Sequence, residues 1–393
     1  MTTSTPAESN AFNMSFTRAE VAFLAAHQAE IIDATQSLQL TAKSTLNDAT
    51  ALRARFGDHG RAVAELARAR RAGVGKFPST WLTDLDAAQQ ATPEPVARLR
   101  AQRLARALGP GALVHDVTCS VGTEGASIST NGLRYLGSDL DPVRLRMAQH
   151  NLLGAWLAQA DALRPISAPD VVVADPARRA GGKRITHPDQ MLPPLPDLQA
   201  AWHSTEMAIK CAPGLDYSGW EGLVSIASVD GGVKEACLYT PGLAGAETRE
   251  AVIIHHGEVD RITDLEPDDV TAGAPGKYLI DPDGAVVRAG LVRHYAHREG
   301  LWMLDERIAY LTGDRIPAGR SGFQIVEVVA LKKLKAALQA HDAGSVEILV
   351  RGVNVDPDVL RKKLKLTGSQ PMAVVCTRIG RQGVALICHA RQA

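Results

Sequence analysis

The sequence lacks the features of a membrane or secreted protein. No apolar run approaches the roughly 18 residues of a transmembrane helix, and the N-terminal MTTSTPAESNAF lacks the basic-then-apolar order of a signal peptide. The five cysteines show neither paired nor metal-like spacing, which argues against disulfides and against a structural metal. We therefore expect a cytoplasmic protein without a membrane segment or a metal site. The sequence does not specify an oligomeric state.

Two common nucleotide-binding signatures are also missing. A dehydrogenase would carry Gly-x-Gly-x-x-Gly after its first strand, but the turn that follows the apolar run ALVHDV offers only Gly122 and Gly125. A phosphate loop with Gly-Lys-Ser or Gly-Lys-Thr occurs nowhere in the chain. Both absences disfavour a pyrophosphate cradle. Aromatic residues make up only 4% of the chain, so any grip on RNA must depend on arginine and lysine.

The overall charge of zero conceals an uneven distribution. Residues 1–110 carry 13 basic and 10 acidic side chains, residues 111–270 carry 12 and 22, and residues 271–393 carry 18 and 11. An acidic middle flanked by basic ends allows a polyanion to be held by the flanks while the middle performs chemistry. The plain alternative is that surface charge simply varies between domains, and charge alone favours that alternative.

The patterning divides the chain into three regions. Residues 1–90 are predicted to form a helical N-terminal domain, and Thr92 could cap a further helix that opens with Pro93 and Glu94. Across residues 91–265, seven short apolar runs alternate with helical stretches: ALVHDV, LRYLGSD, AWLAQAD, DVVVAD, GLVSIAS, ACLYT and AVIIHH. We expect the last two to form a terminal hairpin, because PGLAGAETRE is too short for a crossover helix. The prediction is a mostly parallel, Rossmann-like α/β sheet of seven strands, and residues 266–393 form a third domain.

Acidic residues follow the first three predicted strands. Asp116 ends the first, before a Gly-bearing turn whose N–H groups can face a polar ligand. Asp139 ends the second, where a carboxylate accepts hydrogen bonds from ribose hydroxyls. Asp161 and Ala162 end the third, placed toward an adenine amino group. This order of features predicts binding of S-adenosylmethionine.

These segments carry a family resemblance. DVTCSVGTEG, GSDLDPVRLRMAQHN and DPARRAGG together resemble the trimethylguanosine synthase branch of class I RNA methyltransferases, over about residues 90–260. The resemblance implies that Asp116, Gly122, Asp139 and Asp161 bind the cofactor, with Leu140 and Ala162 against the adenine. Cys119 lies in the cofactor turn, where we expect a small packed residue rather than a nucleophile. The chain departs from the family at Ser120 and Thr123, which replace glycines, and in the absence of an aromatic residue after Asp175-Pro176.

The fourth strand, DVVVAD, ends in the substrate part of the predicted site. The sulfonium methyl of the cofactor needs only an in-line nucleophile, and an amino nitrogen on a base is a weak one. Asp175 could accept the N–H bonds of such a nitrogen and hold it for attack, while Pro176 stiffens the turn. Arg178 and Arg179 could grip a phosphate or stack on a base, although ion pairs with the acidic middle domain are nearly as plausible for them.

The C-terminal third resembles the THUMP-like module that is joined to bacterial methyltransferases of this type. From the pattern alone, it reads as strand QIVEVVA, helix LKKLKAALQA, strand SVEILVR, helix DPDVLRKKLKL, and strands MAVVCTR and GVALICH. The second helix and its flanks concentrate positive charge, and the alternative to RNA binding is a solvated helix face. The residues concerned are Arg351, Arg361, Lys362, Lys363 and Lys365.

These observations predict an S-adenosylmethionine-dependent methyltransferase that modifies a base in structured RNA, such as tRNA or rRNA. One alternative is a methyltransferase of a protein or a small molecule, which uses the flanking regions as a substrate lid. An alternative from another class is a non-catalytic RNA-binding protein that retained the cofactor fold.

Overall fold

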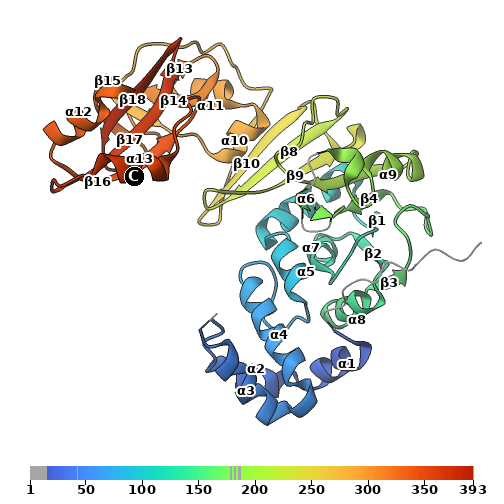
Figure 1. Cartoon of the computed structure of the whole chain (residues 1–393). Coiled ribbons are helices and arrows are strands. Elements are labelled where there is room, and N and C mark those ends of the chain that lie inside the picture. The colour runs from blue at the N-terminus through green and yellow to red at the C-terminus, as the bar shows by residue number, and fades with distance from the viewer. Residues whose placement is uncertain (1–15, 42, 178, 181–182, 185–186, 393) are drawn as a thin grey trace, which may run out of the picture. The chain divides into compact units, whose positions relative to one another are not determined.

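The computed structural model of the chain describes residues 16–41, 43–177, 179–180, 183–184 and 187–392. They form two compact units (Figure 1). The first contains the described residues up to Val224 together with Lys234–Gly245, and the second contains Ser225–Val233 and the residues from Ala246 onward. Within these ranges, no helix combines the length and the apolar character needed to cross a bilayer.

The first unit begins with six helices, as the pattern predicts: α1 (Arg18–Ala26), α2 (Gln28–Gln36), α3 (Thr45–Phe56), α4 (Gly60–Ala72), α5 (Leu85–Gln90) and α6 (Glu94–Leu108). Thr17 and Glu20 form a capping box that starts α1. The apolar faces of α1 to α4 share one core with Val121, Val143 and Met147, which lie beyond residue 90. The helical segment therefore packs onto the part of the chain that carries the predicted cofactor turn.

The start of α6 differs from the prediction. Pro93 occupies the N-cap position and no side chain caps the helix. The Thr92 hydroxyl instead donates a hydrogen bond to Glu235 Oε2 at 2.9 Å, and both residues are buried. A buried carboxylate gains more from that bond than an exposed helix end would, because few other donors can reach it.

The main sheet confirms the predicted α/β class. It contains β1 (Leu113–Asp116), β2 (Arg134–Asp139), β3 (Trp156–Gln159), β4 (Val171–Ala174), β7 (Glu206–Cys211), β8 (Leu223–Val229), β9 (Gly232–Tyr239), β10 (Arg249–His255) and β11 (Glu258–Thr263). Their order is β11-β10-β8-β9-β7-β4-β1-β2-β3. Strands β3, β2, β1, β4 and β7 are mutually parallel, and β9 runs antiparallel to β7. The helices α7 (Thr123–Thr130), α8 (Pro142–Asn151) and α9 (Leu195–Ala201) follow β1, β2 and β4 along the chain.

Two details of the predicted sheet are wrong. Within the described residues, the main sheet has nine strands rather than seven, because β7 and β11 were not predicted. The terminal hairpin is also misassigned, since β9 lies between β7 and β8, and β10 pairs with β11. The apolar pattern of β7 is interrupted by Lys210, a residue that rarely occupies the interior of a buried strand.

The C-terminal part of the second unit confirms the predicted α+β module. It contains β15 (Phe323–Ala330), α12 (Leu334–Ala340), β16 (Ala343–Val350), α13 (Pro357–Leu364), β17 (Gln370–Ile379) and β18 (Gln382–His389). Three strands complete a sheet of order β13-β14-β12-β15-β18-β17-β16: β12 (Tyr278–Ile280), β13 (Trp302–Asp305) and β14 (Ile308–Gly313). Helices α10 (Gly284–Ala289) and α11 (Val292–Glu299) precede β13. The domain boundaries at residues 90 and 265 stay predictions.

Candidate active site

The turn after β1, which is the predicted cofactor turn, contains two residues with left-handed backbone conformations. Gly122 adopts a φ of +91°, which favours glycine, and a Cβ built on it would lie 2.6 Å from Leu152 Cδ1. Ser120, which replaces a family glycine, nevertheless takes a left-handed φ of +49°. That conformation costs a non-glycine residue roughly 1–2 kcal/mol. The N–H of Ser120 donates to Asp139 Oδ2 at 2.9 Å, which helps to offset this cost.

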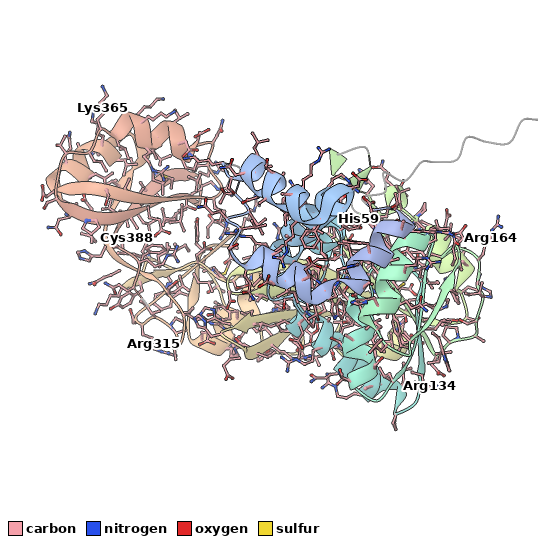
Figure 2. The ribbon with its side chains drawn as sticks, turned by 90° about the horizontal axis from the view of Figure 1, so that it is seen from below. His59, Arg134, Arg164, Arg315, Lys365 and Cys388 are labelled. Atoms are coloured by element: carbon pink, nitrogen blue, oxygen red, sulfur yellow. The ribbon has the colours of Figure 1, made fainter. Side chains whose placement is uncertain are left out.

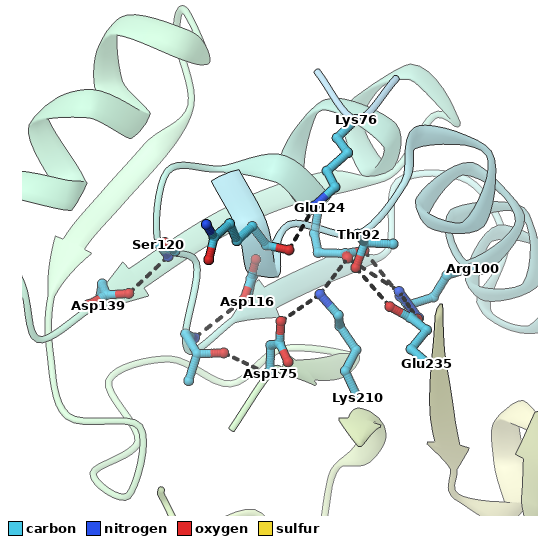
Figure 3. Close-up of polar contacts among 12 residues, drawn as sticks. Lys76, Thr92, Arg100, Asp116, Ser120, Glu124, Asp139, Asp175, Lys210 and Glu235 are labelled. Carbon is cyan, nitrogen blue, oxygen red and sulfur yellow. Dashed lines mark hydrogen bonds and ion pairs between the residues drawn. The ribbon is translucent and has the colours of Figure 1, made fainter. Parts of the chain in front are cut away.

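Asp139 stands at the end of β2 with both carboxylate oxygens oriented by the backbone. Oδ2 accepts from Ser120 N–H at 2.9 Å (Figure 3). Oδ1 accepts from Asp141 N–H, also at 2.9 Å. Burial raises the pKa of Asp139, although these two bonds work in the opposite direction. Leu140, the next residue, is 50% exposed despite its apolar side chain. A fixed acceptor beside an open apolar surface suits a ribose and its base.

The end of the third strand is built differently. Strand β3 stops at Gln159, and the Asp161 carboxylate accepts a hydrogen bond from Leu163 N–H at 3.0 Å, so it stabilises its own turn. Ala162 is buried, and its carbonyl oxygen accepts from Trp202 Nε1 at 2.8 Å. Trp202 in turn packs edge-on against the His115 ring. The Trp202 indole therefore fixes the position of the Ala162 backbone, which lies on the predicted adenine side of the site.

Asp116 and Cys119 lie under the turn rather than on its surface. Asp116 is 2% exposed and accepts from Thr118 N–H and from the Tyr135 hydroxyl, each at 3.3 Å. Burial, with a further contribution from Glu124, raises the pKa of Asp116 to about 8. Burial also raises the pKa of the Cys119 thiol, which fits the packing role predicted for it.

Asp175 directly follows β4, next to the cofactor turn. Its N–H donates to Thr118 Oγ1 at 2.6 Å, and its carboxylate pairs with Lys210 Nζ at 2.7 Å. Pro176 is buried. Arg178 lies outside the described residues. Arg179 lies in the two-residue strand β5 (Arg179–Ala180), which pairs with β6 (Lys183–Arg184), but its side chain is not among the parts described.

A buried group of charged residues beside Asp175 escaped the sequence analysis. Lys210 Nζ also pairs with Glu124 Oε1 at 3.2 Å. Arg100 pairs with Glu124 at 3.1 Å and with Glu235 at 2.6 Å (Figure 3). Their partners lie far apart along the chain, so no local pattern reveals the group. One local signal was available: Lys210 lies inside the otherwise apolar run MAIKC.

The electrostatics of this group are mutually compensating. Burial acts to raise the pKa of Glu124, but Arg100 and Lys210 outweigh it and lower the value to about 2. Burial acts to lower the pKa of Lys210, but Asp175 and Glu124 outweigh it and the pKa is raised. The same balance raises the pKa of Arg100. These three side chains are therefore charged at neutral pH.

Two of the predicted cofactor residues have features that fit S-adenosylmethionine. Asp139 presents oriented acceptors of the kind that ribose hydroxyls need, and Leu140 presents apolar surface of the kind that an adenine needs. The cofactor-binding roles of these and of the other predicted residues stay predictions. Asp116, Gly122 and Asp139 come together with Asp175 because parallel strands end at the same edge of the sheet. The fold and this edge define a class I, Rossmann-like methyltransferase.

The predicted basic residues belong to the second unit. Lys362, Lys363 and Lys365 are exposed on or just after α13, and Lys365 is labelled in Figure 2. Arg361 is also exposed and pairs with Asp358 at 2.8 Å within the same helix. Arg351 is engaged instead with Asp281 at 3.0 Å and lies over the Tyr310 ring, so it stabilises the module.

Comparisons with known proteins agree with this class. Residues 320–390 match the model of the family described as THUMP domain-like. The chain is 48% identical over 349 residues to an uncharacterized S-adenosylmethionine-dependent methyltransferase of Mycobacterium tuberculosis, strain CDC 1551 / Oshkosh, covering 84% of this chain and 96% of the relative. The protein with the same description from strain ATCC 25618 / H37Rv has the same identity and coverage.

The likeness extends to a solved structure. A crystal structure from Porphyromonas gingivalis W83, named as a methyltransferase, superposes with a TM-score of 0.67 at 17% identity and covers 92% of this chain and 98% of that one. At this identity the likeness concerns the fold alone. The identity with the mycobacterial relatives, over nearly their whole length, goes further: the chain belongs to the family of S-adenosylmethionine-dependent methyltransferases.

Proposed function

We propose that this protein transfers the methyl group of S-adenosylmethionine to a nucleobase of structured RNA, with tRNA and rRNA as the substrate class. The observation that carries the proposal is the pairing, in one chain, of a methyltransferase site with an exposed cluster of cations on α13 inside the THUMP domain-like segment. The resemblance of the motifs around Asp116, Asp139 and Asp175 to the trimethylguanosine synthase branch supports the same substrate class.

Asp175 is the residue that we propose for handling the target group. The cofactor supplies an electrophilic methyl group on a cationic sulfur. An exocyclic amino nitrogen has a lone pair delocalised into its base, so it reacts only when it is well oriented. The Asp175 carboxylate, held by Lys210, can accept an N–H of that nitrogen and orient it. Pro176 has no N–H that could compete for the same carboxylate.

The basic residues on α13 would contact the RNA backbone. Arg361, Lys362, Lys363 and Lys365 project four cations from one short stretch, and all four are exposed. The ion pair between Arg361 and Asp358 is no obstacle, because exposed pairs contribute little and a phosphate can replace the carboxylate. Arg178 and Arg179, which follow the proposed target site in sequence, stay predicted substrate contacts.

The proposal is tested by incubating the full chain with methyl-labelled cofactor and total bacterial RNA, then treating samples with RNase or protease. Label that is lost with RNase supports the proposal. Label that is lost with protease, or found in small molecules, identifies the other substrate classes. RNA binding without any transfer identifies a non-catalytic protein. Asp175→Ala serves as the matched variant: we expect its turnover to fall far more than its cofactor affinity.

A further inference from the structure

A lysine inside the main sheet is held by the residue proposed to orient the substrate. Lys210 lies in β7 with only 2% of its side chain exposed, and its ammonium group lies 2.7 Å from Asp175 and 3.2 Å from Glu124. Burying an ammonium is costly unless oxygen atoms surround it. An apolar residue at this position of β7 would avoid the desolvation cost of an ammonium group. The presence of Lys210 therefore indicates a role beyond packing the strand.

The position of Lys210 is fixed in turn by a chain of ion pairs. Its partner Glu124, in the first turn of α7, forms an ion pair with Arg100, and Arg100 also forms an ion pair with Glu235 on β9. The side chains of these residues and of Lys210 are 2–5% exposed, whereas that of Asp175 is 26% exposed. The charged group thus reaches the surface most at Asp175, which is the member that follows β4.

We propose that Lys210 is a positioning residue for methyl transfer, which holds the Asp175 carboxylate at the angle where it accepts a hydrogen bond from the target group. This inference rests on the proposed function and extends it. Lys210 does not act as a base, because its raised pKa keeps it protonated. Its ammonium group is a fixed partner for Asp175 Oδ2, which limits rotation of the carboxylate.

Removing the ammonium has a specific consequence. In Lys210→Met, Glu124 still has Arg100, but Asp175 loses its 2.7 Å partner. A partly buried carboxylate that loses its cation turns toward water. That movement displaces the acceptor from the reacting nitrogen, and a displacement of 1 Å at a reacting group costs roughly 100-fold in rate.

The first experiment separates positioning from cofactor binding. We expect Lys210→Met to lower kcat for RNA methylation by roughly 100-fold while the dissociation constant of S-adenosylmethionine, measured by calorimetry, changes by less than about threefold. Lys210→Arg, which restores a cation, should recover part of the loss. Lys234→Met, which removes an exposed lysine from β9, is the control and should retain wild-type kcat. Equal losses of kcat and cofactor affinity in Lys210→Met would overturn the proposal.

The second experiment tests whether Lys210 acts through Asp175. In an Asp175→Asn background, Lys210→Met should lower kcat by less than about threefold further, since residues that act as a unit are not additive. A full 100-fold further loss would show an independent role. Asp175→Asn/Lys210→Met removes both charges of this pair together, so it does not leave the Asp175 carboxylate without its cation as Lys210→Met does.

A third measurement does not depend on the substrate. The urea midpoints of wild type, Lys210→Met, Asp175→Asn and the double variant form a cycle, and we expect the double variant to lose less than the sum of the single losses. If wild type transfers no methyl group to RNA but the cycle shows coupling, the RNA substrate is wrong and the pairing of Lys210 with Asp175 holds. Additive midpoints would refute the pairing itself.

Discussion

Replacing Asp116 with asparagine should remove one part of the pH dependence of folding stability. Asp116 is 2% exposed, and its two hydrogen-bond donors, Thr118 N–H and the Tyr135 hydroxyl, are both 3.3 Å away. These contacts are too long to offset the loss of water around an ionised carboxylate. Burial and the nearby Glu124 therefore raise its pKa from 3.8 to about 8. The folded protein carries a proton there at neutral pH.

The size of the effect follows from proton linkage. Between about pH 4 and pH 8 the folded protein keeps the Asp116 proton, which the unfolded chain has released. The unfolded state binds fewer protons in this window, so the free energy of unfolding falls as the pH rises toward 8, by about 1.4 kcal/mol per pH unit. The asparagine side chain of the variant has no carboxyl proton to keep or release. The free energy of unfolding of Asp116→Asn, relative to that of wild type, should therefore rise by roughly 3 kcal/mol between pH 5.5 and pH 7.5.

His115 contributes with the opposite sign and cancels in this comparison. Burial lowers its pKa to about 4, so the unfolded chain binds a proton that the folded protein does not between about pH 4 and pH 6.5. Stability from this residue is present above pH 6.5 and is lost as the pH falls. Wild type and Asp116→Asn share His115, so their difference reports Asp116.

The assay is urea unfolding of both proteins at pH 5.5, 6.5 and 7.5, without cofactor, because a bound ligand would add its own stabilisation. The difference in unfolding free energy should rise steadily with pH in favour of the variant. Two parallel curves across this range would refute the reasoning, because they would mean that Asp116 does not change its protonation there on unfolding.

Two further predictions concern the ligands. Asp139→Ala should weaken S-adenosylmethionine binding at least tenfold in calorimetry with the fold intact, since each hydrogen bond to a charged acceptor contributes roughly 1.5–3 kcal/mol; unchanged affinity would contradict the assignment of the ribose site. Replacing four basic residues with glutamine should lower the slope of log affinity against log salt for one transcript by roughly three units, at about 0.7–0.9 per phosphate contact. Equal slopes would identify α13 as a solvated surface. The four residues are Arg361, Lys362, Lys363 and Lys365.

The strands that carry the predicted cofactor residues could be predicted because their signals are local. β4 is an unbroken apolar run that Asp175 directly follows, and β1 and β2 each end in an aspartate before a turn. The strands and helices of the C-terminal module were predicted for the same reason, because the hydrophobic periodicity of a strand or an amphipathic helix depends on neighbouring residues. Strand β7 was missed because a buried lysine breaks that local pattern.

What the sequence by itself determined is the set of acidic strand ends and the cofactor class that they indicate, because a strand and the turn after it depend on adjacent residues. The tertiary structure alone decided how the charges are paired. Arg100 and Glu235 are 135 positions apart, and Arg100 and Glu124 are 24 apart, so only the folded sheet brings them together. Whether a buried charge is tolerated depends on partners that long-range packing supplies. For that reason Lys210 only interrupts an apolar pattern in the sequence, whereas in the structure it forms an ion pair with Asp175.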